Sequence, residues 1–220
     1  MKHLAIIVGH NDRAQGAQRV DTFETEFLFN NRIAQMAQDY AAVNFPAMTV
    51  SVINRLLTTS NRQEIENAYA RADEIGADAV IELHFNSFNT PAAGGCEVLH
   101  AGTERGSALA QDVYDAILRG FPDVRRRGTK VPTTIGGGLG NVTAGKAPAC
   151  LAEPFFGSNR DDCAMFSGDG EAALARAYIE GAADYFDAAF PGWELSAPKP
   201  VKQTKPVPWW QRLINLLKGV

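Results

Sequence analysis

Cysteines are few in this chain, and long apolar runs and internal repeats are missing. The 220 residues include three cysteines, Cys96, Cys150 and Cys163, an odd number without a CxxC pair, which argues against a disulfide scaffold or a cysteine zinc knuckle. No apolar run approaches the roughly 20 residues that a membrane-spanning helix needs. No sequence period of about 20 to 50 residues repeats, so a solenoid is excluded as well.

Net charge is also low, and its distribution is uneven. The chain carries 21 basic and 25 acidic residues, a net charge of −4. Five bases and no acid lie after residue 196, so the first 196 residues hold 16 bases against 25 acids, a net charge of −9. An acidic body repels a phosphate backbone, and we expect no nucleic-acid partner.

What the sequence does contain is an alternation of short apolar runs with amphipathic stretches. With 45% apolar and 21% charged residues, the composition is that of a globular protein with one good-sized core. We expect strands at 4–8, 48–52, 78–83, 96–99 and 149–152, helices at 22–40, 62–75, 107–118 and 171–189, and a long glycine-rich loop at 125–146. The alternation predicts parallel pairing through right-handed crossovers. The fold class is therefore α/β, a three-layer sandwich with a mostly parallel twisted sheet flanked by helices on both faces.

The composition changes near the C-terminus, which divides the chain into three parts. We expect a catalytic domain over 1–191, a Pro/Lys-rich linker over 192–208 and a basic amphipathic tail over 209–220. A tail of this kind gains helical order on an anionic surface. It either contacts an anionic membrane or lipopolysaccharide or folds back on the domain, and the first alternative uses Trp209, Trp210, Arg212 and Lys218.

Three ionisable residues lie at the carboxyl ends of expected strands. His10 follows the first strand, His84 follows the strand at 78–83, and Glu153 follows the strand at 149–152. Because ligands bind beyond the carboxyl ends of strands in open α/β sheets, we expect these side chains to share one edge of the sheet. Converging imidazoles and carboxylates indicate a divalent metal, and a catalytic zinc takes three protein ligands. Glu24 and Glu26, at the start of the first long helix, are both candidates for the further acid, and spacing does not choose between them.

Four ordered motifs over most of residues 4–188 resemble those of one enzyme family. The motifs are IIVGH with Gly16 and Ala17 downstream, EFLFNNRIA, ELHFN, and KAPACLAEPFFGSN. They are similar to motifs of the zinc-dependent N-acetylmuramoyl-L-alanine amidases found among bacterial cell-separation enzymes and phage endolysins, and EPFF is similar to the phage versions in particular. One position departs from the pattern, because Glu82 stands where the family usually has serine.

The resemblance implies a function and a set of site residues. Its register favours Glu26 over Glu24, so zinc would be held by His10, Glu26 and His84, with Glu153 as the general base. The implied reaction is hydrolysis of the amide between N-acetylmuramic acid and the L-alanine of the stem peptide, in peptidoglycan, by a phage or prophage endolysin. Side chains that we expect to bind the substrate are Asn86, Arg127, Lys130 and Asn159.

The five-residue apolar run near the N-terminus is too short for a signal-peptide core. We therefore expect synthesis in the cytoplasm and action on the cell wall or periplasm after release. Two other functions stay open on the sequence. One is another zinc peptidase, such as a carboxypeptidase that acts on cell-wall peptides. The other is a non-catalytic wall-binding or membrane-active protein that acts through its tail.

Overall fold

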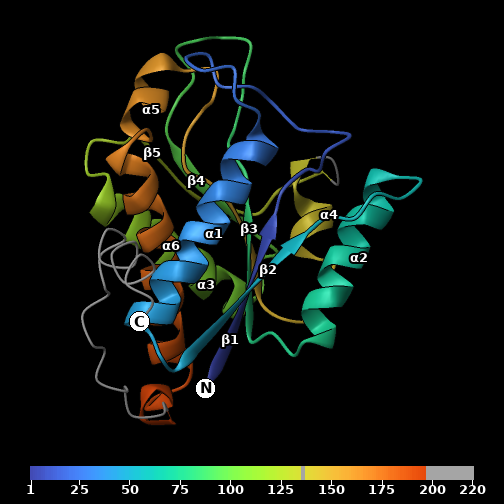
Figure 1. Cartoon of the computed structure of the whole chain (residues 1–220), viewed down its shortest axis with the longest axis vertical. Coiled ribbons are helices and arrows are strands. Elements are labelled where there is room, and N and C mark those ends of the chain that lie inside the picture. The colour runs from blue at the N-terminus through green and yellow to red at the C-terminus, as the bar shows by residue number, and fades with distance from the viewer. Residues whose placement is uncertain (135–136, 197–220) are drawn as a thin grey trace, which may run out of the picture.

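A six-stranded sheet lies between two layers of helices in the computed structural model, which describes residues 1–134 and 137–196 (Figure 1). The strands are β1 (Lys2–Val8), β2 (Met48–Asn54), β3 (Ala79–Leu83), β4 (Cys96–His100), β5 (Arg126–Lys130) and β6 (Ala149–Glu153). The helices are α1 (Glu26–Asn44), α2 (Asn61–Glu74), α3 (Glu104–Gly120), α4 (Leu139–Val142), α5 (Arg160–Met165) and α6 (Asp169–Ala189). This arrangement confirms the expected three-layer α/β fold.

The apolar runs of β1 and β3 arise because both faces of these central strands are covered. The strand order is β2-β1-β3-β6-β4-β5, so β1 and β3 lie side by side inside the sheet. Leu4 and Ile6 of β1 belong to the larger core, under α1, α3 and α6, whereas Ala5 and Ile7 belong to the smaller core under α2. Burial of each large aliphatic side chain contributes about 1.5–3 kcal/mol.

The structure differs from the sequence-based expectation in the second half of the sheet. Strand β4 runs antiparallel to β6, and the segment 125–146, which we expected to be a loop, contains β5 and the short helix α4. β5 pairs only with β4, at the edge of the sheet, and none of its residues is fully buried. An edge strand of sequence RRGTK has no apolar run from which it can be recognised.

Helix α1 begins at Glu26, four residues later than the sequence suggested. The side chain of Thr25 accepts a hydrogen bond from the backbone N–H of Leu28 and so caps the first turn. This start places a carboxylate in the first turn of the helix, beside the carboxyl ends of β1 and β3. The helix cap therefore fixes where Glu26 meets the sheet edge.

Packing continues to the end of the described chain. Trp193, in a short 3-10 helix at Trp193–Ser196, is buried and packs edge-on against Phe186 at a ring-centroid distance of 5.5 Å. The remainder of the expected linker and the whole tail, with Trp209, Trp210, Arg212 and Lys218, lie outside the described residues. Within the described ranges, no helix has both the length and the apolar character needed to cross a membrane.

Candidate metal centre and active site

The end of β1 brings His10 to the sheet edge through an unusually close approach. A Cβ atom at Gly9 would lie 2.5 Å from the Nε2 atom of His84, and one at Gly16 would lie 2.6 Å from Oε2 of Glu26. Both positions therefore need glycine, which gives the two glycines of the first motif a physical reason. His10 itself has a left-handed backbone with φ of 66°, a conformation that costs about 1–3 kcal/mol in a non-glycine residue.

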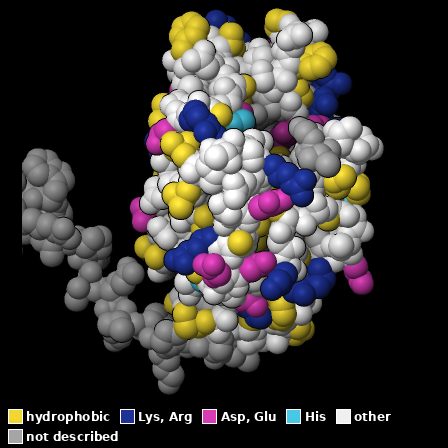
Figure 2. Space-filling model, turned by 90° about the vertical axis from the view of Figure 1, so that its right-hand side faces the viewer, with side chains coloured by type: hydrophobic (Ala, Val, Ile, Leu, Met, Phe, Trp, Pro, Cys, Tyr) yellow, Lys and Arg dark blue, Asp and Glu magenta, His cyan; other side chains and the backbone are white. Residues whose placement is uncertain are grey.

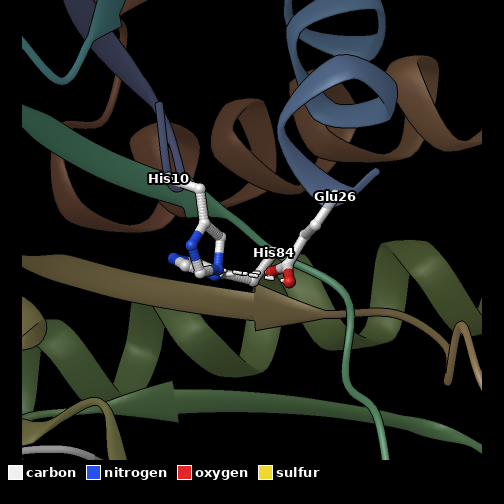
Figure 3. A group of neighbouring side chains, drawn as sticks. All are labelled: His10, Glu26 and His84. Carbon is white, nitrogen blue, oxygen red and sulfur yellow. Dashed lines mark hydrogen bonds and ion pairs between the residues drawn. The ribbon is translucent and has the colours of Figure 1, made fainter. Parts of the chain in front are cut away.

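The carboxylate of Glu26 lies between the two histidines. Its Oε2 is 3.2 Å from Nε2 of His10, and its Oε1 is 2.7 Å from Nδ1 of His84 (Figure 3). The same oxygens accept hydrogen bonds from the backbone N–H groups of Ala17 and Phe85. A buried carboxylate is thus held from four sides, with one edge turned towards both imidazoles.

Glu24, the other acid that the sequence left open, lies elsewhere. Its carboxylate pairs with the guanidinium of Arg32 on the surface of the molecule. The structure places Glu26, and not Glu24, beside His10 and His84.

The charges of these groups support one another. Burial raises the pKa of Glu26, but hydrogen bonds and charge interactions with His10 and His84 outweigh it and bring the pKa to about 2. Burial lowers the pKa of His84, but Glu26 and Glu82 outweigh it and raise the pKa to about 9. His84 is thus a buried imidazolium between two carboxylates. A metal cation bound at the same place would displace a proton from this imidazolium.

The three side chains fit a zinc ion. One ligand atom from each of His10, Glu26 and His84 lies within 4.8 Å of the other two. Zinc binds imidazole nitrogen and carboxylate oxygen at about 2.0–2.2 Å, which separates tetrahedral ligands by about 3.3 Å. Two nitrogens and one oxygen are a donor set typical of catalytic zinc, in which the fourth position stays open for water or substrate.

Glu153 stands at the end of β6, opposite Glu97 of the antiparallel strand β4. Asn86 links the two carboxylates, because its side-chain amide donates to Oε2 of Glu153 at 2.6 Å and to Oε1 of Glu97 at 3.0 Å. Glu97 also accepts hydrogen bonds from Arg127 and Lys130. The carboxylate of Glu153 at the end of β6 therefore has a second carboxylate, Glu97, as its neighbour. Glu97 in turn is held by two cationic side chains.

The surroundings of Glu153 favour its protonated form more than water does. Burial raises its pKa most; the charge of His84 lowers it, the nearby carboxylates of Glu97 and Glu26 raise it, and the resulting pKa is about 7. A carboxylate with a pKa near neutrality is suited to accept and return a proton during catalysis. Glu153 is therefore the candidate general base and acid of this site.

The like charge of Glu97 gives a testable pH dependence. A general base works when deprotonated, so the rate of a reaction that uses Glu153 as its base rises with pH through the pKa of Glu153. Glu97→Gln removes a negative neighbour and leaves two cations nearby, so the acidic limb of the pH–rate profile is expected to shift to lower pH. A bound metal cation does not change the direction of this shift, because it acts on Glu153 in the wild type and in Glu97→Gln alike.

The measurement is the pH dependence of kcat/KM for wild type and Glu97→Gln on solubilised peptidoglycan, the substrate that the sequence resemblance implies. Glu74→Gln, which changes an exposed acid paired with Arg71, is the matched control and is expected to leave the profile in place. An unchanged limb, or a limb at higher pH, in Glu97→Gln would show that Glu97 does not act on the base.

The site opens into a cleft of about 620 Å³ at the carboxyl ends of β1, β3 and β6. Figure 2 shows a hollow near the top of the molecule, between two projecting parts, with a histidine side chain at its base. The loop that follows β5 forms one wall, because residues 131–134, Gly137 and Gly138 contribute to the lining.

Two of the four expected substrate-binding residues line this cleft, and two do not. Asn86 and Lys130 are part of the lining. Arg127 is not; it pairs with Glu97 and lies over the ring of Phe156. Asn159 caps α5 instead, accepting from two backbone N–H groups and donating to backbone carbonyls of the 91–93 segment. Its hydrogen-bonding groups are used within the protein, so we interpret its role as structural.

Glu97 is the residue of the candidate site that the sequence analysis missed. The sequence did contain an indication of it, because Glu97 is an acid inside the apolar strand CEVLH. A buried charge without a partner is costly at such a position. The meaning of this indication depended on the register between β4 and β6, which the sequence does not show.

Comparison with known proteins identifies a family. A family model described as N-acetylmuramoyl-L-alanine amidase matches residues 4–184. No curated protein sequence matches the chain significantly.

Several solved structures share the fold. The catalytic domain of CwlV, an N-acetylmuramoyl-L-alanine amidase from Paenibacillus polymyxa, aligns with a TM-score of 0.73 at 21% identity, over 85% of this chain and 99% of that one. AmiC2 of Nostoc punctiforme, also an N-acetylmuramoyl-L-alanine amidase, aligns with a TM-score of 0.71 at 20% identity, over 84% and 97% of the two chains. The catalytic domain of the CD27L endolysin, which targets Clostridia difficile, aligns with a TM-score of 0.69 at 23% identity, over 84% and 98%.

Proposed function

Because the chain belongs to the N-acetylmuramoyl-L-alanine amidase family and is a hydrolase of peptidoglycan, we propose that it cleaves the bond between N-acetylmuramic acid and L-alanine with zinc held by His10, Glu26 and His84. The observation that carries this proposal is the convergence of these three side chains within 4.8 Å, in a cleft that the half-buried carboxylate of Glu153 at the end of β6 also lines. A metal site and a proton carrier in one cleft are what amide hydrolysis requires.

His10, Glu26 and His84 would hold a zinc ion, which would lower the pKa of a water from about 15.7 towards 7 and polarise the scissile carbonyl. The two backbone N–H groups that bind Glu26 keep that carboxylate from rotating away. The rigid sheet edge therefore presets the geometry before substrate arrives.

Glu153 moves the proton. Its carboxylate takes a proton from the attacking water and then passes it to the departing nitrogen, because an amide nitrogen leaves poorly unless it is protonated. Asn86 holds Oε2 of Glu153 through a 2.6 Å hydrogen bond. Lys130, on the wall of the cleft, binds a carboxylate of the stem peptide.

We further propose that the enzyme is a phage or prophage endolysin that reaches the wall after release from the cytoplasm, and that its basic tail contacts an anionic membrane or lipopolysaccharide. The structural likeness to an endolysin catalytic domain and the phage-like EPFF segment at Glu153–Phe156 support the first statement. Five bases without an acid after residue 196 support the second.

Mass spectrometry of purified peptidoglycan after digestion, with and without EDTA, tests the reaction. The proposed function predicts glycan free of peptides together with peptides that begin at a free L-alanine, and neither product when EDTA is present. Shortened stem peptides that remain attached to glycan would instead identify a carboxypeptidase. Lysis that survives EDTA without bond cleavage would identify a non-catalytic protein.

A further inference from the structure

A second buried carboxylate lies directly behind the metal centre, and the proposed mechanism leaves it without a role. Glu82 is on β3, two residues before His84, and none of its surface is exposed. Alternation along the strand places both side chains on the face of the sheet that α2 and α4 cover. An ionised carboxylate in such a place is costly unless every lone pair is used.

Donors from three further elements use those lone pairs. The guanidinium of Arg55, just after β2, forms a buried ion pair with Oε1 of Glu82. The Tyr69 hydroxyl of α2 donates to Oε2 at 2.9 Å, and the Asn141 amide of α4 lies 3.0 Å from both oxygens. These contacts fix the carboxylate in one position and orientation.

The remaining contact of Glu82 is with the metal-binding histidine. Its Oε1 lies 3.2 Å from Nε2 of His84, while Nδ1 on the other side of the ring lies 2.7 Å from Glu26. A histidine that binds a metal through Nδ1 carries its proton on Nε2, and that N–H needs an acceptor. The only carboxylate at Nε2 among the described residues is Glu82.

We propose that Glu82 is a positioning residue for the metal centre: it accepts the Nε2–H hydrogen bond of His84 and so holds the ring with Nδ1 turned towards the zinc. This inference rests on the proposed zinc site. It assigns a role to the position at which this chain departs from the serine usual in the family it resembles. A serine side chain is too short to combine the ion pair with Arg55 and the contact with His84.

The test is the zinc affinity of the folded full-length protein, measured by competition with a chromogenic chelator. Glu82→Gln keeps an acceptor but removes its charge, and we expect affinity to fall about tenfold. The double variant Glu82→Met/Arg55→Met removes the acceptor without leaving a buried charge unpaired, and we expect a fall of about 100-fold; loss of a partner of a zinc-binding histidine costs about 10–100-fold. The double variant keeps the test available if the single one folds poorly.

Tyr69→Phe is the matched control, because it removes a donor from the same buried cluster but leaves the contact between Glu82 and His84. We expect its zinc affinity to stay within about twofold of wild type. A second measurement follows the Nε2–H proton of His84 by NMR in zinc-loaded, ¹⁵N-histidine-labelled protein, which has only four histidines. This proton is expected to move upfield in Glu82→Gln and to stay in place in Tyr69→Phe.

Three outcomes would overturn the inference. Equal zinc affinity in wild type and both Glu82 variants would show that Glu82 does not position the ligand. An equal loss in Tyr69→Phe would show that the cluster acts through packing alone. A wild-type protein that binds no zinc would overturn the proposed function as well, whereas the first two results would leave the proposed function standing.

Discussion

Glu153→Gln is expected to bind zinc as tightly as the wild-type protein and to hydrolyse peptidoglycan about 10²–10⁴-fold more slowly, the range usual for loss of a general acid–base group. Glutamine has nearly the same shape and still accepts the hydrogen bond from Asn86, so the cleft is expected to stay intact. What it lacks is the ability to take a proton from water and return it to the leaving nitrogen. Binding and turnover should therefore separate in this variant.

The measurements are zinc content by elemental analysis and the release of L-alanine amino termini from purified peptidoglycan. Glu97→Gln is a useful companion, because it changes the neighbouring carboxylate but leaves the base in place, and it is expected to retain most turnover at neutral pH. Wild-type rates in Glu153→Gln would remove Glu153 from the mechanism. Loss of zinc together with turnover would instead make it a part of the metal site.

His84→Ala is expected to lose zinc and turnover together. Two protein ligands remain, and we expect zinc affinity to fall by more than about 100-fold, the upper range seen when only a partner of a ligand is replaced. Turnover is expected to fall at least as far as in Glu153→Gln. The buried carboxylates of Glu26 and Glu82 each lose a hydrogen-bond partner, which we expect to lower the free energy of unfolding of the metal-free protein by about 1–3 kcal/mol.

Two controls separate the metal site from general effects. His3→Gln changes a histidine at the opposite end of β1, where the ring bonds to Ser51 and to the carbonyl of Ile75, and it should retain zinc. Glu24→Gln changes the other acid near the start of α1 and should retain zinc too. Stoichiometric zinc in His84→Ala would refute the assignment of His84, and zinc loss in Glu24→Gln would reopen the choice of the acid.

The central sheet could be predicted from the sequence because its strands are buried on both faces. Unbroken apolar runs such as Leu4–Val8 have no other simple interpretation once a helix follows. The antiparallel direction of β4 is indicated by the connection before it and not by the residues of the strand. No helix lies between Leu83 and Cys96, so the chain re-enters the sheet at the edge where it left, and β4 runs in the opposite direction to β3. β5 had no signal of its own, since its fold depends on pairing with β4 alone.

The three side chains of the candidate metal site could be grouped from the sequence because each stands at a position that the fold makes unusual. His10 and His84 lie within two residues of the ends of buried strands, and the register of the second motif favours Glu26. The partners of these residues could not be predicted in the same way. Glu97 meets Glu153 through an antiparallel register, and Tyr69 and Asn141 reach Glu82 from two helices far apart in the sequence. Contacts of this kind exist only after the elements have packed.

Anomalous diffraction at the zinc edge, from crystals of the native full-length enzyme, tests the metal centre most directly. We predict a single strong peak per chain within about 2.0–2.2 Å of Nε2 of His10, a carboxylate oxygen of Glu26 and Nδ1 of His84. A chain without a peak between these side chains, or with zinc bound elsewhere while they point apart, would contradict the proposed site and the mechanism built on it.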